Sequence, residues 1–295
     1  MAPDTRTTCF DARLLRGLVG TAVTTYDLAS DGASPDSTSL APSTEPSRAT
    51  TSPTTPSALA ASPMTVMSAS SGISRTWVIT EKLSERAAPL TDHDVKMGRG
   101  SAKTVGKFLC HLAEDPNQIA FMRIYQQIPI TGTEDADHDI LARQAVPPGV
   151  CGELESFKLL QTGRCNAVPR FLGHAESTQG DNDLVPGGYI RYLVWEKVPG
   201  EPLTKEFFWS LDDTARKDIR SKFRVAYDCG VAPGQSRISK IIFDQSTGNL
   251  HISGFRRGWP IISKLEWSEA RYVEFGLAKP SRESDWYLHP AKWQW

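Results

Sequence analysis

Hydrophobic residues follow two different spacings in the middle of the chain. Residues 188–198 are rich in aromatic and β-branched side chains and are followed by Pro-Gly, which predicts a buried strand and a turn. Residues 240–255 contain two strand-like runs joined by a polar turn at 245–249. Between these blocks, a capping box at residues 210–213 predicts the start of an amphipathic helix, whose apolar face is Leu211, Ala215, Ile219, Phe223 and Tyr227.

A second group of elements is predicted upstream. Gly98-Arg-Gly100 marks a turn, and residues 119–125 read as a strand. A helix is expected to open at residues 147–149, with Val150, Leu154 and Phe157 along one face. Strands followed by mixed helices and a hairpin favour an α+β fold.

Composition limits the class of protein and its partners. The chain has 295 residues, of which 39% are hydrophobic and 23% charged, enough for one large core or two lobes that share a cleft. A formal net charge of −1 gives no electrostatic reason to expect nucleic acid or an anionic membrane as a partner. The five cysteines have no C-x-x-C spacing, so we expect neither disulfides nor a zinc site: Cys9, Cys110, Cys151, Cys165 and Cys229.

Residues 1–75 differ from the rest of the chain. From residue 30 to residue 74 they are mainly Ser, Thr, Pro and Ala, which cannot bury enough apolar area to offset chain entropy, so a disordered tail is expected. The tail is either a passive linker or a phosphorylated regulatory segment. The apolar run 14–23 is interrupted by Arg16 and too short to span a bilayer, so the sequence favours a cytoplasmic or nuclear protein.

The order of strand, turn, helix, irregular loop and hairpin resembles the middle of the protein-kinase-like superfamily. Three phrases carry the resemblance, at residues 121–129, 185–189 and 194–203, and they are similar in particular to divergent kinase-like proteins of filamentous fungi. The resemblance implies a two-lobed fold, with a small lobe at 76–198 and a shortened large lobe at 199–295.

The resemblance also implies a nucleotide site that could hold ATP, without a recognisable Mg²⁺ site, although the sequence does not establish any cofactor. Gly98, Gly100 and Val105 would cover the phosphates and the base, although an ordinary turn explains the two glycines equally well. Arg123 stands where kinases carry a lysine, and its expected partner is Glu155, with Glu153 as the alternative. This pair could also be purely structural.

Two further residues belong to the expected hinge between the lobes. Glu196 and Val198 would lie beside the base, which backbone groups hold in kinases.

The positions that carry kinase chemistry are replaced. The resemblance puts Gln235 at the catalytic base, Lys240 at one metal ligand and Gly254 at the other, and none of these side chains can do those jobs. No magnesium site is therefore expected, although Lys240 and Arg256 could offset phosphate charge without metal. Asp244 is expected to be a hairpin-turn residue, with a rescued metal role as the alternative, and His251 a strand residue.

The segment after residue 255 is very aromatic. We expect these side chains to pack across the large lobe, with a protein-binding patch as the alternative: Trp259, Trp267, Tyr272, Phe275, Trp286, Tyr287, Trp293 and Trp295.

Three functions remain. The favoured one is a catalytically defective kinase-like binding or scaffold module with an unknown protein partner. The alternatives are an atypical phosphotransferase acting on a small molecule, and a decayed gene product without a molecular role.

Overall fold

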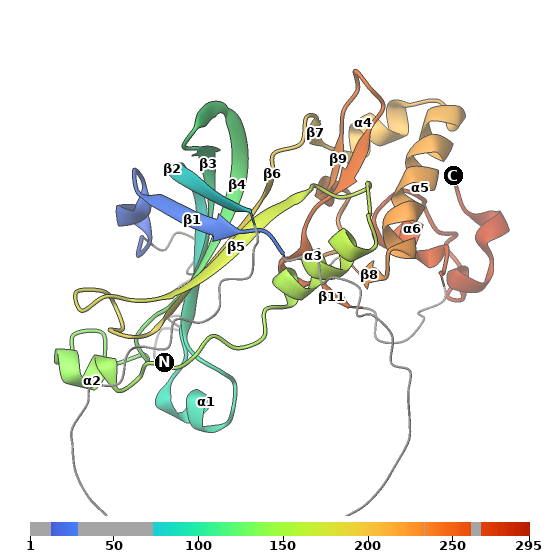
Figure 1. The fold of residues 1–295 in the computed structure, drawn as a ribbon. Helices are drawn as coiled ribbons and strands as arrows, with labels where there is room; N and C mark the ends of the chain where they lie inside the picture. The colour runs from blue at the N-terminus through green and yellow to red at the C-terminus, as the bar shows by residue number, and fades with distance from the viewer. Residues whose placement is uncertain (1–12, 29–72, 233, 261–266) are drawn as a thin grey trace, which may run out of the picture.

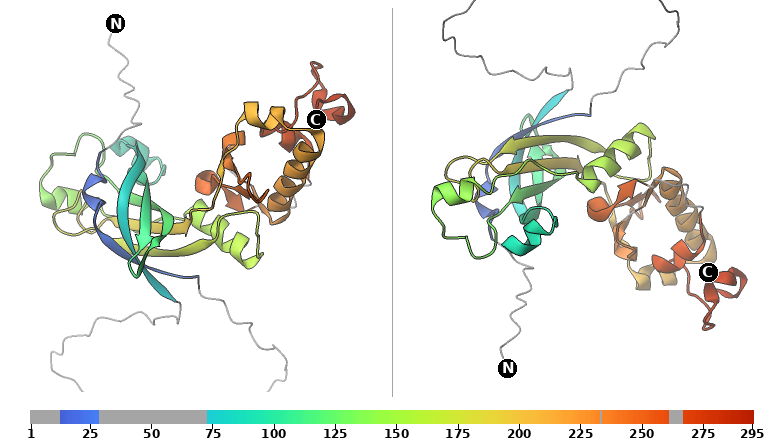
Figure 2. Two further views of the ribbon diagram at one scale, coloured as in Figure 1. Left: turned by 90° about the horizontal axis from the view of Figure 1, so that it is seen from above. Right: turned by 90° about the horizontal axis from the view of Figure 1, so that it is seen from below.

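The computed structural model of the protein describes residues 13–28, 73–232, 234–260 and 267–295. These residues form a mixed α+β structure in which a β-rich lobe is followed by a largely helical region (Figure 1). Views from above and below show the two parts side by side, with helix α3 at their junction (Figure 2).

Six antiparallel strands make one closed sheet in the small lobe, in the order β1-β2-β3-β4-β6-β5. Their bounds are β1 Ala22–Tyr26, β2 Ser74–Ala88, β3 Lys103–Leu112, β4 Asp115–Gln127, β5 Phe171–Thr178 and β6 Tyr189–Glu196.

Strand β1 corrects the expected extent of the N-terminal tail. Residues 13–28 belong to the small lobe, because β1 pairs with β2 along its whole length and meets β5 at Tyr26. The 3₁₀ helix η1 (Arg16–Leu18) precedes this strand. Leu15 is fully buried, and its N–H donates to the buried carboxylate of Glu85 at 3.2 Å. Residues 1–12 and 29–72 of the expected tail lie outside the described residues.

The two faces of the sheet have different surroundings because side chains alternate along each strand. On β4, Met122 and Ile124 enter a hydrophobic cluster inside the closed sheet, together with Trp77 of β2 and Phe108 of β3. The intervening residues of β4 face α3 and the large lobe. Tyr125 belongs to the hydrophobic cluster on that side.

Three helices of the small lobe lie in the connections between strands. Helix α1 (Asp92–Lys96) lies between β2 and β3, and α2 (His138–Ala142) and α3 (Gly152–Thr162) lie between β4 and β5. Helix α3 begins three residues later than expected, so Val150 precedes it and is 81% exposed. Leu154 and Phe157 are buried, as predicted.

The large lobe starts after β6. Its elements are β7 Glu201–Pro202, α4 Lys205–Ser210, α5 Asp213–Asp228, β8 Val231–Ala232, η2 Ile238–Lys240, β9 Ile241–Phe243, β10 Leu250–Ile252, η3 Phe255–Arg257, β11 Trp259–Pro260, α6 Ala270–Glu274, η4 Trp286–Leu288 and η5 Pro290–Lys292. The predicted hairpin is confirmed, with β9 and β10 paired antiparallel. The predicted helix is α5, although its N-cap is Asp212, whose side chain accepts the N–H of Ala215 at 2.7 Å, and Ser210 ends the separate helix α4.

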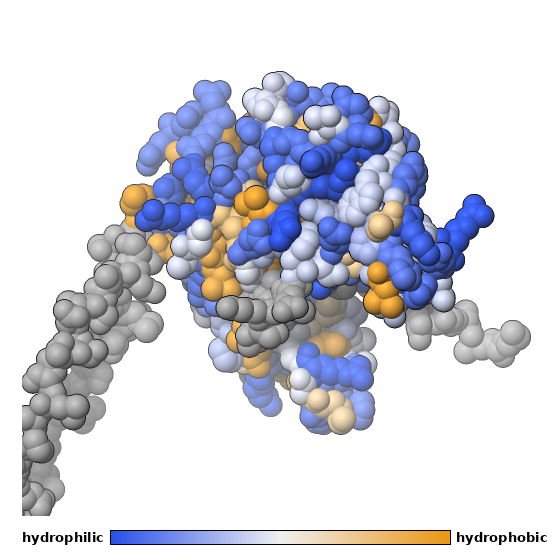
Figure 3. Space-filling model, turned by 90° about the vertical axis from the view of Figure 1, so that its right-hand side faces the viewer, coloured by the Kyte–Doolittle hydropathy of each residue, from blue (hydrophilic) through white to orange (hydrophobic). Residues whose placement is uncertain are grey.

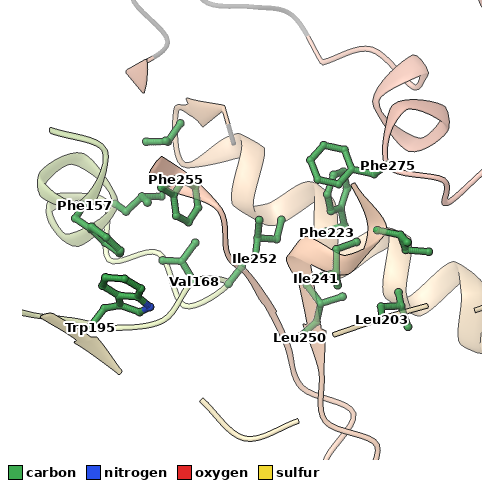
Figure 4. Close-up of a cluster of buried hydrophobic side chains, with 14 of the residues drawn as sticks. Phe157, Val168, Trp195, Leu203, Phe223, Ile241, Leu250, Ile252, Phe255 and Phe275 are labelled. Carbon is green, nitrogen blue, oxygen red and sulfur yellow. The ribbon is translucent and has the colours of Figure 1, made fainter. Parts of the chain in front are cut away.

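A second hydrophobic cluster joins the lobes (Figure 4). Phe157 of α3 stacks on Trp195 of β6 with ring centroids 5.9 Å apart, and it meets Phe255 of the large lobe at 6.0 Å. The same cluster continues through Ile252 of the hairpin to Phe223 of α5. Separating the lobes would therefore expose apolar area from both.

The C-terminal aromatic residues cover α5. Phe275 lies 4.7 Å from Phe223 between ring centroids, and Trp293 is buried in the same cluster. The expected packing of the aromatic side chains is confirmed for Phe275 and Trp293, whereas Tyr287 is exposed. The side chain of Trp259 is not among those that the structure describes. The face shown in Figure 3 is mostly hydrophilic, with hydrophobic residues in small groups.

Candidate functional site

The candidate site lies on the α3-facing side of the small-lobe sheet. Lys107 of β3 stands opposite Arg123 of β4, and Val105 stands opposite Tyr125 two residues further along the pair. Residues with a spacing of two point to the same side of a strand, so these four side chains share one surface. Val105, expected beside the base, is buried in the cluster that joins the lobes.

Arg123 forms an ion pair with Glu153 of α3, at 2.5 Å. The second carboxylate oxygen of Glu153 accepts the hydroxyl of Tyr125 at 2.6 Å, and this glutamate is only 2% exposed. Burial opposes the charge of Arg123, but Glu153 outweighs this effect and raises the pKa of the guanidinium. Both oxygens of Glu153 are therefore already hydrogen-bonded.

The expected partner, Glu155, was the wrong choice. Glu155 pairs with Lys158 of its own helix at 2.9 Å, and about two fifths of each side chain is exposed. Residues two apart on an α-helix point in nearly opposite directions, so Glu153 and Glu155 cannot both face the sheet. The alternative partner, Glu153, is the residue that faces it.

Three further cations surround this pair. Lys107, Lys240 of η2 and Arg256 of η3 each interact electrostatically with Arg123. The pKa of Lys107 is lowered to about 8, mainly by burial. The positive charges of Arg123 and Lys240 contribute to this decrease, and the negative charge of Glu153 partly offsets it. Burial and Arg123 also lower the pKa values of Lys240 and Arg256. Within the described residues, none of these three cations makes an ion pair with a carboxylate.

Lys240 and Gly254 lie side by side. The backbone oxygen of Lys240 accepts both the N–H and the hydroxyl of Ser253, at 2.7 and 3.0 Å. Gly254 has a φ of +99°, and a Cβ placed on it would lie 3.0 Å from Cδ of Lys240. The lysine side chain therefore occupies the space that a side chain at Gly254 would enter.

Gln235 precedes η2 and is half-buried. Its backbone oxygen accepts the N–H of Arg237 at 3.1 Å. None of the side-chain hydrogen bonds in the described part of the chain involves Gln235. Its role as a replaced base remains a prediction.

Asp244 has the expected role of a turn residue. Its side chain accepts the N–H and hydroxyl of Ser246, at 2.9 and 2.7 Å, and the hydroxyl of Thr247 at 2.7 Å. These bonds lower the pKa of the carboxyl. His251 lies on β10, as expected; it is half-buried, and burial lowers its pKa.

Glu196, in the expected hinge, is engaged by protein contacts. The N–H of Glu196 donates to the backbone oxygen of Arg170 at 2.9 Å, and its carboxylate accepts the N–H of Arg170 at 3.4 Å. Val198 is buried. The N–H of Glu196 is therefore not available to a nucleotide base.

An aromatic pair lies just before the hinge. Phe121 and Trp195 stand opposite each other on β4 and β6, with ring centroids 6.1 Å apart. The ammonium of Lys107 lies 3.6 Å from the centre of the Phe121 ring, a cation–π contact. Sequence reasoning missed Lys107, although its spacing of two from Val105 puts it on the same face.

The predicted glycine-rich loop is preceded by a helix in the connection from β2 to β3. Helix α1 has a capping box between Thr91 and Asp94, and Gly98 and Gly100 follow it with φ of +74° and +90°. Both glycines are exposed. The connection from β2 to β3 is therefore longer than a tight hairpin loop. Of the two glycines, Gly100 lines a cavity described below and Gly98 does not.

One exposed cluster has the residue types of a metal site. The donor atoms of Glu283, Asp285 and His289 lie within 4.8 Å of one another. However, Lys292 donates to both oxygens of Glu283, at 2.8 and 2.9 Å, and His289 is bonded to Asp285 at 3.1 Å. These contacts explain the cluster without an ion.

No family model matches the sequence, and no curated protein matches it. Among solved structures, the chain is similar to the PK-1 kinase of the Cydia pomonella granulovirus, with a TM-score of 0.38 and 12% identity. The match covers 65% of this chain and 56% of the viral chain, so the chain spans just over half of that kinase. Similarity at this level does not establish a function.

None of the helices in the described segments is both long and apolar enough to span a bilayer.

Proposed function

We propose that the chain has a protein-kinase-like fold and acts as a binding module that holds a phosphate-bearing anion with its own cations, without transferring phosphate. The order of elements supports the fold: strands β2, β3 and β4, then helix α3, then β5 and β6, with β6 beside β4. The ion pair between Arg123 of β4 and Glu153 of α3 supports it further, since kinases join the same two elements in this way.

The cation cluster is the observation that carries the binding role. Lys107, Arg123, Lys240 and Arg256 interact with one another around a single carboxylate. Charged groups that are partly withdrawn from water and lack a partner are unfavourable, and a bound polyanion would relieve their repulsion. A phosphate chain supplies several negative oxygens that accept charge-assisted hydrogen bonds from lysine and arginine.

The absence of free carboxylate oxygens in this cluster argues against metal-dependent chemistry. Mg²⁺ requires oxygen ligands, and both oxygens of Glu153 are bonded to Arg123 and Tyr125. Asp244, the alternative metal ligand, uses its oxygens within its own turn. No specific contact among the described residues favours the alternative of an atypical phosphotransferase.

Calorimetric titration with ATP, in EDTA and then in Mg²⁺, tests the proposal. We expect binding in EDTA that weakens when Mg²⁺ neutralises part of the phosphate charge. Lys240→Met should reduce the affinity about tenfold, equal to about 1.4 kcal/mol. Lys279→Met is the matched control, because that ammonium lies over the ring of Trp209 on the large lobe. Binding that requires Mg²⁺, or transfer of phosphate to an acceptor, would contradict the proposal.

A combined variant sharpens the test. Changing Gln235→Asp, Lys240→Asn and Gly254→Asp restores the residue types of the kinase positions and removes the lysine that contacts Gly254. We expect Mg²⁺-dependent ATP binding to appear in this variant before any turnover. If it binds ATP more tightly in EDTA than in Mg²⁺, as the parent should, the assignment of these three positions is wrong.

A further inference from the structure

A cavity of about 630 Å³ lies at the end of the small-lobe sheet away from the hinge. The starts of β3 and β6, the end of β4, the loop from β4 to α3 and the first residue of α3 surround it. Cavities of this size are typical of small-molecule sites. It is separate from the hinge, because neither Glu196 nor Val198 lines it.

The walls are mainly apolar. Ile128, Ile130 and Val146 of the β4–α3 connection line the cavity together with Tyr125 and Tyr189. The hydroxyl of Tyr125 is bonded to Glu153, and that of Tyr189 lies 3.3 Å from the hydroxyl of Ser101. With these polar ends already bonded, the rings offer mainly apolar surface to a ligand.

The polar wall residues are held in place by bonds among themselves. Gln127 donates to the backbone oxygen of Gln144 at 2.6 Å and accepts the N–H of Val146 at 3.1 Å. Arg191 is bonded to Glu176 at 2.6 Å and to the backbone oxygen of Gly149 at 2.8 Å. These bonds leave the wall preformed, so a ligand would lose little affinity to ordering it.

The charged residues that line the cavity are all cations: Lys103, Arg191 and Arg256. Arg256 lines it and is half-buried, and none of the lining residues is Asp or Glu. Helix α3 begins at Gly152, which also lines the cavity, and its N-cap Cys151 makes no side-chain capping bond. The first N–H groups of a helix have no partner inside it and favour an anion, so they add to the attraction of Arg256.

We propose that this cavity binds a small organic carboxylate with an aromatic or branched apolar body. The apolar part would lie against the isoleucine, valine and tyrosine side chains, and the carboxylate would lie between Arg256 and the start of α3. This site goes beyond the proposed anion site, which uses Lys107, Arg123 and Lys240; only Arg256 is shared.

Titration of the full chain with 2-naphthoate, and in parallel with the uncharged 2-naphthamide, tests the site. We expect saturable binding of 2-naphthoate and affinity at least tenfold weaker for the amide. Arg256→Gln should remove most of this difference. Equal affinities of the parent for acid and amide would overturn the proposed role of the charge.

Two filling variants test the location. Val146→Trp and Gly149→Phe each add a ring at the cavity wall, and Gly149 has no neighbouring atoms that an added Cβ would strike. Each should reduce 2-naphthoate affinity at least tenfold with an unchanged urea midpoint and unchanged ATP binding. Lys240→Met should do the opposite, weakening ATP and leaving 2-naphthoate unaffected. Naphthoate binding that survives in both folded filling variants would overturn the assignment to this cavity, whatever the outcome with ATP.

Discussion

The two lobes contribute different sets of charged groups to the space between them. The small lobe supplies a complete pair, in which Glu153 is hydrogen-bonded by both Arg123 and Tyr125. The large lobe supplies Lys240 and Arg256, and neither makes an ion pair with a carboxylate among the described residues. The pair is therefore expected to matter mainly for stability, and the unpaired cations mainly for binding.

The difference also explains why a buried ion pair alone says little about function. A buried pair contributes little net stability, but removal of one partner leaves the other charge uncompensated. Removing an unpaired cation leaves no opposite charge uncompensated, so we expect its loss to cost little stability. Substitutions on the two sides should therefore have different effects.

The largest effect is expected on the small-lobe side. Glu153→Ala leaves the largely buried Arg123 beside Lys107 without a counter-charge, and it leaves the hydroxyl of Tyr125 without its acceptor. Loss of one member of a buried pair typically costs about 3–5 kcal/mol. Urea denaturation followed by tryptophan fluorescence should show this decrease in the free energy of unfolding.

Glu155→Ala is the matched control on the same helix. Its pair with Lys158 is exposed, so the change should be below about 0.5 kcal/mol. Equal losses for the two variants would mean that Glu153 is not the partner of Arg123 in solution.

A smaller effect is expected where Lys240 meets Gly254. Gly254→Ala puts a non-glycine residue at a φ of +99° and a Cβ close to the lysine side chain, so it should cost about 2 kcal/mol or more. Gly276→Ala is the control, because it has a φ of +78° and only an ordinary contact at 3.5 Å; it should cost about 1 kcal/mol. Thermal melting of both variants measures the difference.

Adding Lys240→Ala to Gly254→Ala separates strain from crowding. The double variant should recover the part of the loss that exceeds that of Gly276→Ala. If it recovers nothing, the lysine side chain does not lie against Gly254.

The smallest effect concerns pH. The pKa of Lys107 is lowered from 10.5 to about 8 in the folded chain, so the unfolded chain binds more protons between these two values. Stability should therefore rise with pH from about 8 towards 10.5, and the affinity for ATP should fall over the same window as Lys107 loses its charge. Urea midpoints of the parent and Lys107→Met between pH 7.5 and 9.5 provide the measurement. A parallel rise in both proteins would assign the effect to another group.

Much of the fold could be predicted from local patterns. The hairpin of β9 and β10 and the amphipathic helix α5 were found because their periodicity is clear within a few residues. Strand β1 was missed because its signal is short, and a long Ser/Thr/Pro-rich segment separates it from its partner β2. Its place in the sheet depends on pairing with the distant strand β2, which no local pattern reveals.

The site was less predictable than the fold. Arg123 and Lys240 were recognised from their positions, but choosing between Glu153 and Glu155 required the rotation of α3, which follows from where that helix begins. Lys107 was missed because a lysine on a half-buried strand has no sequence signature of its own. Only the folded chain brings Lys107 close enough to Arg123 and Lys240 to belong to the cation cluster.

The way in which β1 joins the sheet has a consequence for how this chain tolerates change. The N–H of Asp27 donates to the backbone oxygen of Ile73 at 3.1 Å, so the two ends of segment 29–72 meet. The entropy of closing a loop whose ends are fixed together grows only with the logarithm of its length. Residues could therefore be removed from this segment, or a foreign domain inserted into it, with little change in folding free energy.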